Sequence, residues 1–443
     1  MFDFFDKVRK NVKAYQQFLE DNNVQDIQKW SDIPLCDKEN YLLKYPMKEL
    51  AQEDISNAFL IGTSSGFSKS GSVFWLKEAV DERAYLEIIK QIFIKEYSID
   101  RQKTLFIISL AFGTWIGGMQ IATTLRAMAS DMEHVTLATP GLDLKEAAEI
   151  AQKFGAFYDQ ILWICNPSSI NIIYALVKDD DSLLQGKISF PVVGEYFSED
   201  FREDIAFKFG HDRKYIYSIK TGYGSADAGD LGIESEETVK LRKFFNNHSE
   251  LLQKLFKTNE APMMFVRNEK AFIESIEGEL IVTKDQFIPL VRYNTKDRGG
   301  ILKKRDIKEY IDSVLYATLP DEILYVFGRV SDSIIFYGTN LNIHEIDKFL
   351  SSLKEMSYGG LFDVKEIQKD GVSLFEFTIY TEDIKEELAL EYQNTLIEFL
   401  KKSSNEFSAK YDKLSKAVDK DLITVNLKFI NELQIDKKHR YIK

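Results

Sequence analysis

The amino-acid sequence predicts an α/β protein with two domains, because three features of the chain agree. Its 443 residues exceed the length at which a single hydrophobic core usually stops growing. Short apolar runs alternate with helical patterns over residues 104–223, which indicates a largely parallel sheet with helices on its faces. After Gly278 the pattern changes to strands and turns, as expected for a β-rich subdomain of a large N-terminal domain.

Local patterns predict the elements of the N-terminal part. The first 60 residues alternate amphipathic helical pieces with turns, and Asp37 stands where it can cap a helix after an extended entry. The segment 143–155 carries apolar residues at helical spacing. The strand candidates are TLFIISL, HVTLAT, QILWIC, ISFPVVG and YIYSIKTGYG.

A small α+β C-terminal domain is expected beyond a boundary near Gly328. We therefore divide the chain into domains 1–330 and 331–443. Residues 386–410 have apolar side chains at helical spacing, which predicts a packed helix face. The strand candidates are SDSIIFYG, DVKEIQKDGVSLFEFTIYT and LITVNLKFI, and the helix candidates are HEIDKFLSSLKEM and IKEELALEYQNTLIEFLKKSSNEF.

Composition excludes several classes of protein. The chain has 57 basic and 70 acidic residues, and this net charge of −13 disfavours a nucleic-acid partner. Cys36 and Cys165 are too few for a disulfide framework, which fits a reducing cytosol. The start of the chain has no signal-peptide pattern, so a cytoplasmic location is expected. Residues 105–125 are uncharged, but their Gly, Ser and Thr residues predict a strand, a turn and a helix start instead of a membrane span.

The segment 61–72, IGTSSGFSKSGS, is a candidate phosphate-binding loop. Glycine removes the Cβ barrier to close approach, and Ser and Thr hydroxyls add hydrogen-bond donors to the backbone N–H groups. Taken alone, the same composition also fits a polar surface turn.

The segment 221–232, TGYGSADAGDLG, follows a predicted strand and combines three useful groups. Tyr223 offers a flat face for a purine, the Ser225 hydroxyl can contact a phosphate, and the Asp227 carboxylate can hold Mg²⁺. The alternative is a glycine-rich strand-to-helix turn in which an aspartate caps the helix.

Two further segments complete the pattern. GELIVT followed by PLVRYNTKDRGG puts Arg292 and Asp297 at the end of an apolar strand, and a carboxylate there is a natural acceptor for two ribose hydroxyls. YVFGRVSDSIIFYG places Arg329 at the expected domain junction and Gly338 at the end of the next strand. Taken singly, either segment could be a hairpin.

In this order and at this spacing, the four segments resemble the adenylate-forming superfamily of acyl-CoA synthetases. The I-P-L-x-x-K phrase at residues 33–38 and the glycine pair in TWIGGMQ are most similar to the phenylacetate-CoA ligase family. The resemblance extends over residues 33–440. It implies ATP-dependent activation of a small-molecule carboxylic acid through an acyl adenylate, followed by transfer to CoA, under a C-terminal lid.

The resemblance also implies roles for individual residues. Lys437, at Lys-x-x-Arg spacing from Arg440 and with Lys438 in reserve, and Asp227 are the implied catalytic residues, and Asp227 is the implied Mg²⁺ ligand. Ser331 or Asp332 would form the hinge. The implied acyl pocket draws on Phe112, Trp115, Gly117, Gly118 and the strand before Gly194. The residues implied to bind ATP are Ser64, Ser65, Gly66, Ser68 and Lys69 at the phosphates, Gly194, Glu195 and Tyr223 at the adenine, Gly224 and Ser225 beside them, Asp297 at the ribose, and Arg329, which closes on the nucleotide.

The chain departs from the family pattern at three places. Lys69, Ser70 and Gly71 stand where a second Gly followed by Lys and Pro is usual, Asp227 replaces a glutamate, and His344 replaces a proline. Two alternatives therefore stay open beside an acid–CoA ligase. One is an adenylating enzyme that loads an acyl carrier protein or another nucleophile, and the other is a non-catalytic relative that binds a nucleotide. The acid itself is not identified, because 32 Phe and 21 Tyr residues suit an aryl pocket and core packing equally.

Overall fold

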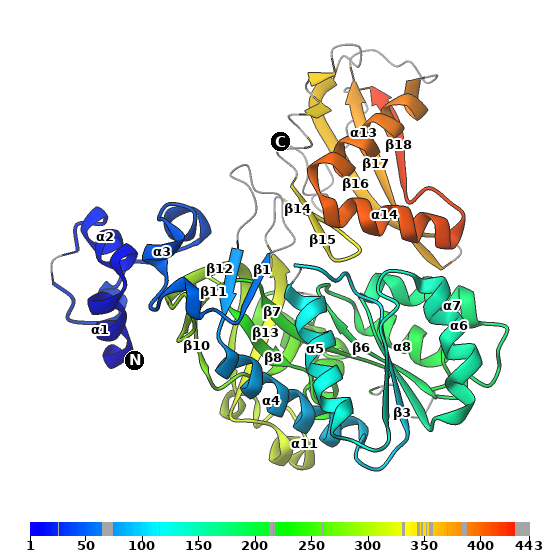
Figure 1. Cartoon of the computed structure of the whole chain (residues 1–443), viewed down its shortest axis with the longest axis horizontal. Coiled ribbons are helices and arrows are strands. Elements are labelled where there is room, and N and C mark those ends of the chain that lie inside the picture. Colours follow the sequence, from blue (N-terminus) through cyan, green and yellow to red (C-terminus); the bar gives the residue numbers. More distant parts are fainter. Residues whose placement is uncertain are drawn as a thin grey trace.

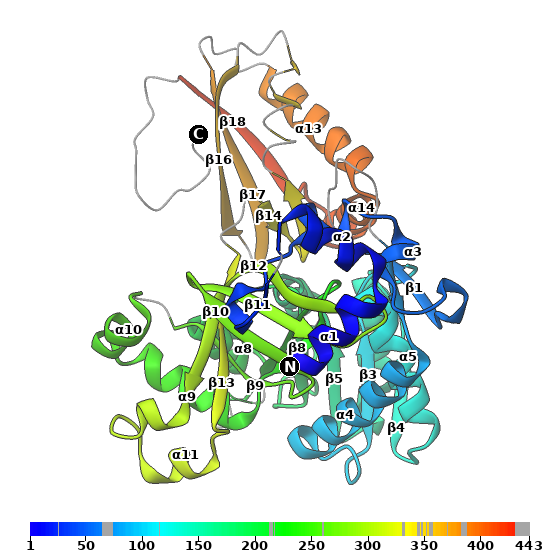
Figure 2. The same ribbon diagram turned by 90° about the vertical axis from the view of Figure 1, so that its left-hand side faces the viewer.

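The protein has a large body built on one sheet and a smaller α/β unit at one end of it (Figures 1 and 2). The coordinates are a computed structural model. The described residues are all those of the chain other than 25, 64–73, 115, 212–215, 217, 259–260, 330–332, 343–345, 347–348, 351, 354–357, 370, 382–387 and 430–443.

The body contains a mixed sheet of 11 strands. Its half from β4 to β7 is parallel, and every strand pair from β7 to β10 is antiparallel. The predicted parallel sheet is therefore confirmed, and the β-rich part after Gly278 continues the same sheet. In spatial order the strands are β10 (Ala271–Ile276), β11 (Glu279–Lys284), β12 (Leu290–Lys303), β13 (Glu322–Arg329), β9 (Met263–Arg267), β8 (Gly229–Ile233), β7 (Ile219–Ser225), β6 (Ile188–Val193), β5 (Gln160–Ile164), β3 (Thr104–Ile108) and β4 (Val135–Ala138).

Helices cover both faces of the parallel half (Figure 1). Because successive strand residues point to opposite faces, β3 contributes Leu105 and Ile107 to one core and Phe106 and Ile108 to another. The first core includes residues of α6, α7 and α8, and the second includes residues of α4 and α5. A third core joins α9, α10 and α11 to the antiparallel half. These helices are α4 (Ala79–Tyr97), α5 (Ile116–Ser130), α6 (Leu144–Phe154), α7 (Ile170–Val177), α8 (Glu199–Lys208), α9 (Glu236–Asn246), α10 (Ser249–Phe256) and α11 (Ser313–Thr318).

The N-terminal segment packs beside β10, β11 and β12 (Figure 2). Buried Arg292 donates hydrogen bonds to the Ser31 and Ile33 carbonyls, which ties this segment to β12. The predicted cap at Asp37 is present, since its carboxylate accepts a hydrogen bond from Asn40 N at 2.8 Å. The elements here are α1 (Phe2–Asn11), α2 (Lys13–Asp21), the π-helical turn η2 (Lys38–Leu42), α3 (Met47–Leu50) and the hairpin of β1 (Leu60–Thr63) with β2 (Phe74–Lys77). Short 3₁₀ turns are η1 (Trp30–Asp32), η3 (Ile55–Asn57), η4 (Gly155–Phe157), η5 (Pro167–Ser169) and η7 (Lys304–Ile307).

The C-terminal unit is a three-stranded sheet covered by two helices (Figure 1). The helical pattern predicted over residues 386–410 is divided at Ser404, whose extended backbone ends α13 and whose hydroxyl caps α14 by accepting from Phe407 N at 3.1 Å. The elements are β16 (Tyr358–Lys369), β17 (Val372–Thr381), β18 (Ile423–Phe429), α13 (Ala389–Ser403) and α14 (Asn405–Val418), preceded by the hairpin of β14 (Ser333–Phe336) with β15 (Thr339–Asn342).

The apolar stretch 105–125 folds as the sequence predicted. It forms β3, a turn with Gly113 at φ +89°, and the first turns of α5. Over the described part of the chain, no helix combines the length and apolar character that crossing a membrane requires.

Candidate active site

Two of the predicted site residues meet across the sheet, Tyr223 near the end of β7 and Asp297 in the middle of β12, which continues to Lys303 beyond the strand end that the sequence predicted. The Tyr223 hydroxyl donates a hydrogen bond of 2.7 Å to Asp297 Oδ2, although the residues are 74 positions apart. The Tyr223 ring packs against Phe265 of β9, with 5.6 Å between ring centroids. Asp297 is buried, and its backbone N–H donates to Thr295 Oγ1 at 3.2 Å. The tyrosine and the carboxylate are thus held in a fixed relative position.

Asp227 lies in the turn between β7 and β8 and is also held from β12. The buried Tyr293 hydroxyl donates a short hydrogen bond to Asp227 Oδ2. Gln286 Nε2 donates to the Asp227 carbonyl at 2.7 Å. Burial, followed by the Asp227 charge, raises the pKa of Tyr293 well above its ordinary value, so the phenol stays protonated as the donor.

The turn that carries Asp227 is tightly closed. Ser225 Oγ accepts a hydrogen bond from Ala228 N at 3.0 Å. Lys284 Nζ donates to the carbonyls of Ala228 at 2.5 Å and Asp230 at 3.2 Å. Burial raises the pKa of the Asp230 carboxyl above its usual range, although Lys284 opposes this effect. The Ser225 hydroxyl predicted to contact a phosphate therefore already closes the hairpin turn.

The end of β6 places Gly194 against Asn166. Gly194 has φ +90°, and a Cβ there would lie 3.0 Å from Asn166 Nδ2, which donates to the Val193 carbonyl at 2.9 Å. A Cβ on Gly338, at the tip of the β14–β15 hairpin, would lie 2.5 Å from the same Nδ2 atom. The Asn166 side chain therefore lies between the strand end and the C-terminal hairpin.

Glu195 lies near the same hairpin. Burial raises the pKa of Tyr337, and the nearby Glu195 charge adds to the shift. Burial and then Glu195 raise the pKa of the Cys165 thiol as well, so Cys165 remains a neutral thiol without nucleophilic character.

Three of the predicted acyl-pocket residues lie where β3 leads into α5, with Phe112 in the turn and Gly117 and Gly118 in the first turn of α5. A Cβ on Gly118 would lie 2.0 Å from the Ala111 carbonyl oxygen, so glycine allows α5 to approach this backbone. Gly117 is exposed and has open space at its Cβ position. Phe112 packs on Gly141, where a Cβ would lie 3.2 Å from the ring. Of these three residues, only Gly117 lies beside open space, whereas Gly118 allows α5 to pack closely against the backbone of Ala111.

The predicted phosphate loop begins beside this turn. Thr63, at the end of β1, donates its backbone N–H to the Thr114 carbonyl at 2.7 Å. At the other end of the hairpin, Lys77 Nζ lies 3.3 Å from the position of a Cβ on Gly229. The two strands that flank residues 64–73 thus lie beside the β3–α5 turn and the β7–β8 turn.

Several predicted site residues lie outside the described residues. Arg329 is the last residue of β13 and pairs in register with Asp297, so its backbone adjoins the site. Across the ranges that the structure describes, no group of three His, Cys, Asp or Glu side chains could hold a metal ion. The predicted residues outside the description are Ser64, Ser65, Gly66, Ser68, Lys69, Trp115, Ser331, Asp332, His344, Lys437, Lys438 and Arg440.

Sequence reasoning gave no role to two residues that the geometry brings to the site. Tyr293 stands inside the R-Y-x-T-x-D segment, so its place in that motif could have drawn attention to it. Asn166 directly follows a predicted strand, but its position between two glycines depends on contacts distant in the sequence.

Comparisons with known proteins bear on the fold. No protein-family model matches the sequence, and no curated protein matches it. A solved structure of 2-hydroxyisobutyryl-CoA ligase, in complex with 2-HIB-AMP and CoA in the thioesterification state, superposes with a TM-score of 0.57 at 13% identity, covering 98% of this chain and 86% of that one. The chain therefore shares its fold with this ligase.

Two further structures agree with this finding. The same ligase in the postadenylation state with 2-HIB-AMP gives a TM-score of 0.52 at 13% identity, covering 99% of this chain and 85% of the ligase. The amide bond synthetase McbA from Marinactinospora thermotolerans gives 0.50 at 12% identity, covering 90% of this chain and 70% of the synthetase. At such identities the likeness is one of fold, and function has to be argued from the site.

Proposed function

We propose that this protein activates a carboxylic acid with ATP through an acyl adenylate and then transfers the acyl group to a thiol, as an AMP-forming acid–CoA ligase similar to the phenylacetate-CoA ligases. The observation that carries the proposal is the hydrogen bond from Tyr223 to Asp297. It joins an aromatic face, which can pack on an adenine, to a buried carboxylate, which can accept from ribose hydroxyls, beside the carboxyl end of β7. In open α/β sheets, ligands bind beyond the carboxyl ends of the strands.

Adenylation, the first step, is opposed by electrostatic repulsion, because a negatively charged carboxylate must approach the negatively charged phosphates of ATP. A substrate carboxylate attacks the α-phosphorus of ATP, so a carboxyl-oxygen to phosphorus bond forms and the bond to pyrophosphate breaks. In the proposed arrangement Tyr223 and Asp297 orient the nucleoside, and the backbone of residues 64–68 holds the phosphates. The Lys437 ammonium neutralises charge on the reacting groups, and a preorganised group of this kind typically contributes about 10² to 10³ in rate.

Asp227 fits a magnesium ion that accompanies ATP. Mg²⁺ is usually held by one or two carboxylates together with substrate phosphates, so one protein carboxylate in a hydrogen-bonded turn is sufficient. The Tyr293 hydroxyl and the Gln286 amide fix this turn. The ion would supply charge neutralisation at the phosphates.

The likeness to an amide bond synthetase favours a second candidate for the acceptor. In that reading the acyl adenylate is passed to a carrier-protein thiol or to another nucleophile such as an amine. Both candidates share the first step and assign residues 1–330 to nucleotide and acid binding. They also assign residues 331–443 to a lid that turns about Ser331 or Asp332.

Pyrophosphate exchange tests the shared step. The protein is incubated with ATP, labelled pyrophosphate and a panel of aryl, hydroxy and aliphatic acids, and the acyl adenylate is identified by mass spectrometry. Acid-dependent exchange supports adenylation, and product analysis with CoA, a carrier protein or an amine then separates the acceptors. Binding of ATP without exchange for any acid would instead favour the non-catalytic relative.

A further inference from the structure

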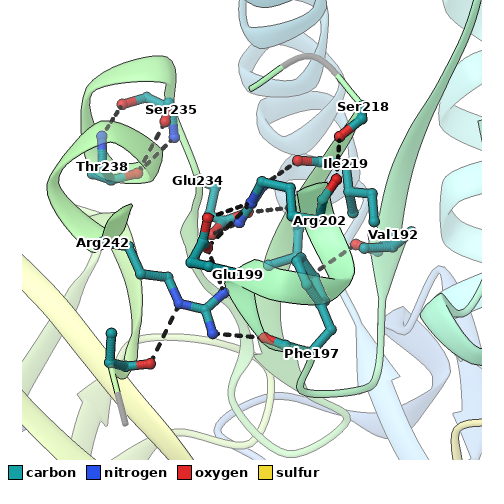
Figure 3. Close-up of polar contacts among 12 residues, drawn as sticks. Val192, Phe197, Glu199, Arg202, Ser218, Ile219, Glu234, Ser235, Thr238 and Arg242 are labelled. Atoms are coloured by element: carbon teal, nitrogen blue, oxygen red, sulfur yellow. Dashed lines mark hydrogen bonds and ion pairs between the residues drawn. The ribbon is translucent and has the colours of Figure 1, made fainter. Parts of the chain in front are cut away.

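A chain of four buried charged side chains runs behind the candidate nucleotide site. Arg242, Glu199, Arg202 and Glu234 alternate in charge, and all four are almost completely buried (Figure 3). Arg242 Nη1 lies 3.0 Å from Glu199 Oε1. Arg202 donates from Nε to both Glu199 oxygens, at 3.1 and 3.2 Å, and from Nη2 to Glu234 Oε1 at 2.8 Å.

The Glu234 end of the chain holds strand β7. Glu234 Oε2 accepts a hydrogen bond from Thr221 N at 3.0 Å, two residues before Tyr223. The Thr221 hydroxyl in turn donates to the Val192 carbonyl at 3.1 Å, two residues before Gly194. This end therefore fixes the spacing of β6 and β7 just below the site.

The Arg242 end holds the loop that follows β6. Arg242 Nη2 donates to the Phe197 carbonyl at 2.6 Å, three residues after Gly194. Its guanidinium carbon also lies 5.2 Å from the centroid of the Tyr196 ring. The two ends of one continuous network thus hold two backbone segments, 194–197 and 221–225. These segments carry Gly194, Glu195 and Tyr223, the residues that the resemblance assigns to the adenine.

Stability alone is a weak reason for this arrangement. The free energy lost when charged groups are removed from water is about as large as the free energy gained from their mutual attraction. Apolar residues of similar volume therefore often stabilise a core equally well. A charged network differs from an apolar core because its hydrogen bonds fix the positions of particular backbone groups, here Thr221 N and the Phe197 carbonyl. We infer that Arg242, Glu199, Arg202 and Glu234 are positioning residues that set the width of the adenine slot and thereby its selectivity for the base.

The inference rests on the proposed nucleotide site and is tested at the two ends of the network. Arg242→Met leaves Glu199 paired with Arg202, and Glu234→Gln keeps the side-chain shape while losing one of two hydrogen bonds. For each variant, calorimetry measures the Kd of ATP, GTP and inorganic pyrophosphate. We expect the Kd of ATP to rise about tenfold with a smaller preference for ATP over GTP, and the Kd of pyrophosphate to stay within about twofold.

Lys220→Met is the matched control. Lys220 lies in the same strand and forms its ion pair with buried Glu96, so its loss destabilises the protein while the hydrogen bonds from Glu234 and Arg242 to the two segments remain. It should lower the melting temperature and leave the ATP-to-GTP preference unchanged. If Arg242→Met does not fold, Glu234→Gln alone tests the inference. Arg242→Lys keeps the positive charge, so it should show a preference for ATP over GTP between those of Arg242→Met and wild-type protein.

The outcomes separate this inference from the proposed function. The positioning role alone would be overturned if wild-type protein binds ATP and the variants keep its preference for ATP over GTP. It would also be overturned if the variants lose affinity for ATP and for pyrophosphate to the same extent. The same base-specific loss in Lys220→Met would also overturn it. Wild-type protein that does not bind ATP would overturn the proposed function and this inference together.

Discussion

Asp297→Ala should weaken ATP binding chiefly through the ribose. In the proposed site the buried Asp297 carboxylate accepts from two ribose hydroxyls as well as from Tyr223. Hydrogen bonds to a charged group are worth about 1.5 to 3 kcal/mol each. Even at the lower value, two of them amount to about 3 kcal/mol, so the Kd of ATP should rise about a hundredfold.

Calorimetry with ATP and with 2′,3′-dideoxy-ATP isolates this contribution. Wild-type protein should prefer ATP strongly, whereas Asp297→Ala should bind both nucleotides about equally. Tyr223→Phe should cost about 1 kcal/mol in the wild-type background and less when Asp297 is already absent, since the two side chains are in contact.

The exposed Asp285 provides the control for this experiment. Its ion pair with Lys7 is at the surface, where such pairs contribute little, and Asp285→Ala should leave both nucleotide affinities unchanged. The ribose assignment is wrong if Asp297→Ala still distinguishes ATP from the dideoxy nucleotide as well as wild-type protein does.

Four further outcomes are expected. Lys437→Ala should suppress adenylate formation about 10² to 10³-fold in a pyrophosphate-exchange assay while a preformed adenylate still binds; exchange at the normal rate would move the role to Lys438. Gly118→Ala should lower stability by about 1 to 3 kcal/mol in urea unfolding, because its methyl group would meet the Ala111 carbonyl; an unchanged midpoint would contradict the close approach. Tyr293→Phe should raise the Mg²⁺ concentration needed for half-maximal exchange, because the Asp227 turn loses its donor, and an unaltered Mg²⁺ titration would argue against Asp227 as the ligand. Asp230→Asn should raise the melting temperature at neutral pH, and this difference from wild-type protein should disappear in acid. Burial raises the pKa of Asp230 in the folded state, so wild-type protein loses stability as the pH rises through that pKa. A difference in melting temperature that does not depend on pH would contradict this reasoning.

The sequence predicted the features that depend on local pattern. The parallel half of the sheet follows from alternating apolar runs and helical segments, and the cap at Asp37 follows from its position before a polar turn. The meeting of Tyr223 with Asp297 was implied by the resemblance, which assigned both residues to the nucleotide, but the strand end predicted at Asp297 is wrong because β12 continues to Lys303.

Features that depend on tertiary contacts were not predicted. Glu199, Arg202, Glu234 and Arg242 look like ordinary surface charges of amphipathic helices and strand ends, and only the packed structure pairs them in the interior. Ser404 lies inside an unbroken helical pattern, yet its extended backbone begins a new helix. Propensity is a weak guide where a cap or a buried pair decides the local conformation.

The two-sided burial of β3 and β5 restricts where the sequence of this protein can change. Ile161 and Trp163 of β5 enter one core while Leu162 and Ile164 enter the other, and the Trp163 indole N–H donates to Ser109 Oγ at 2.8 Å. Inserting or deleting a single residue in such a strand would exchange its side chains between the cores. Under the proposed function, adaptation to a different acid is therefore expected at the exposed turn of Gly113 and Thr114, because Ser109, Leu110 and Cys165 directly after these strands are themselves buried.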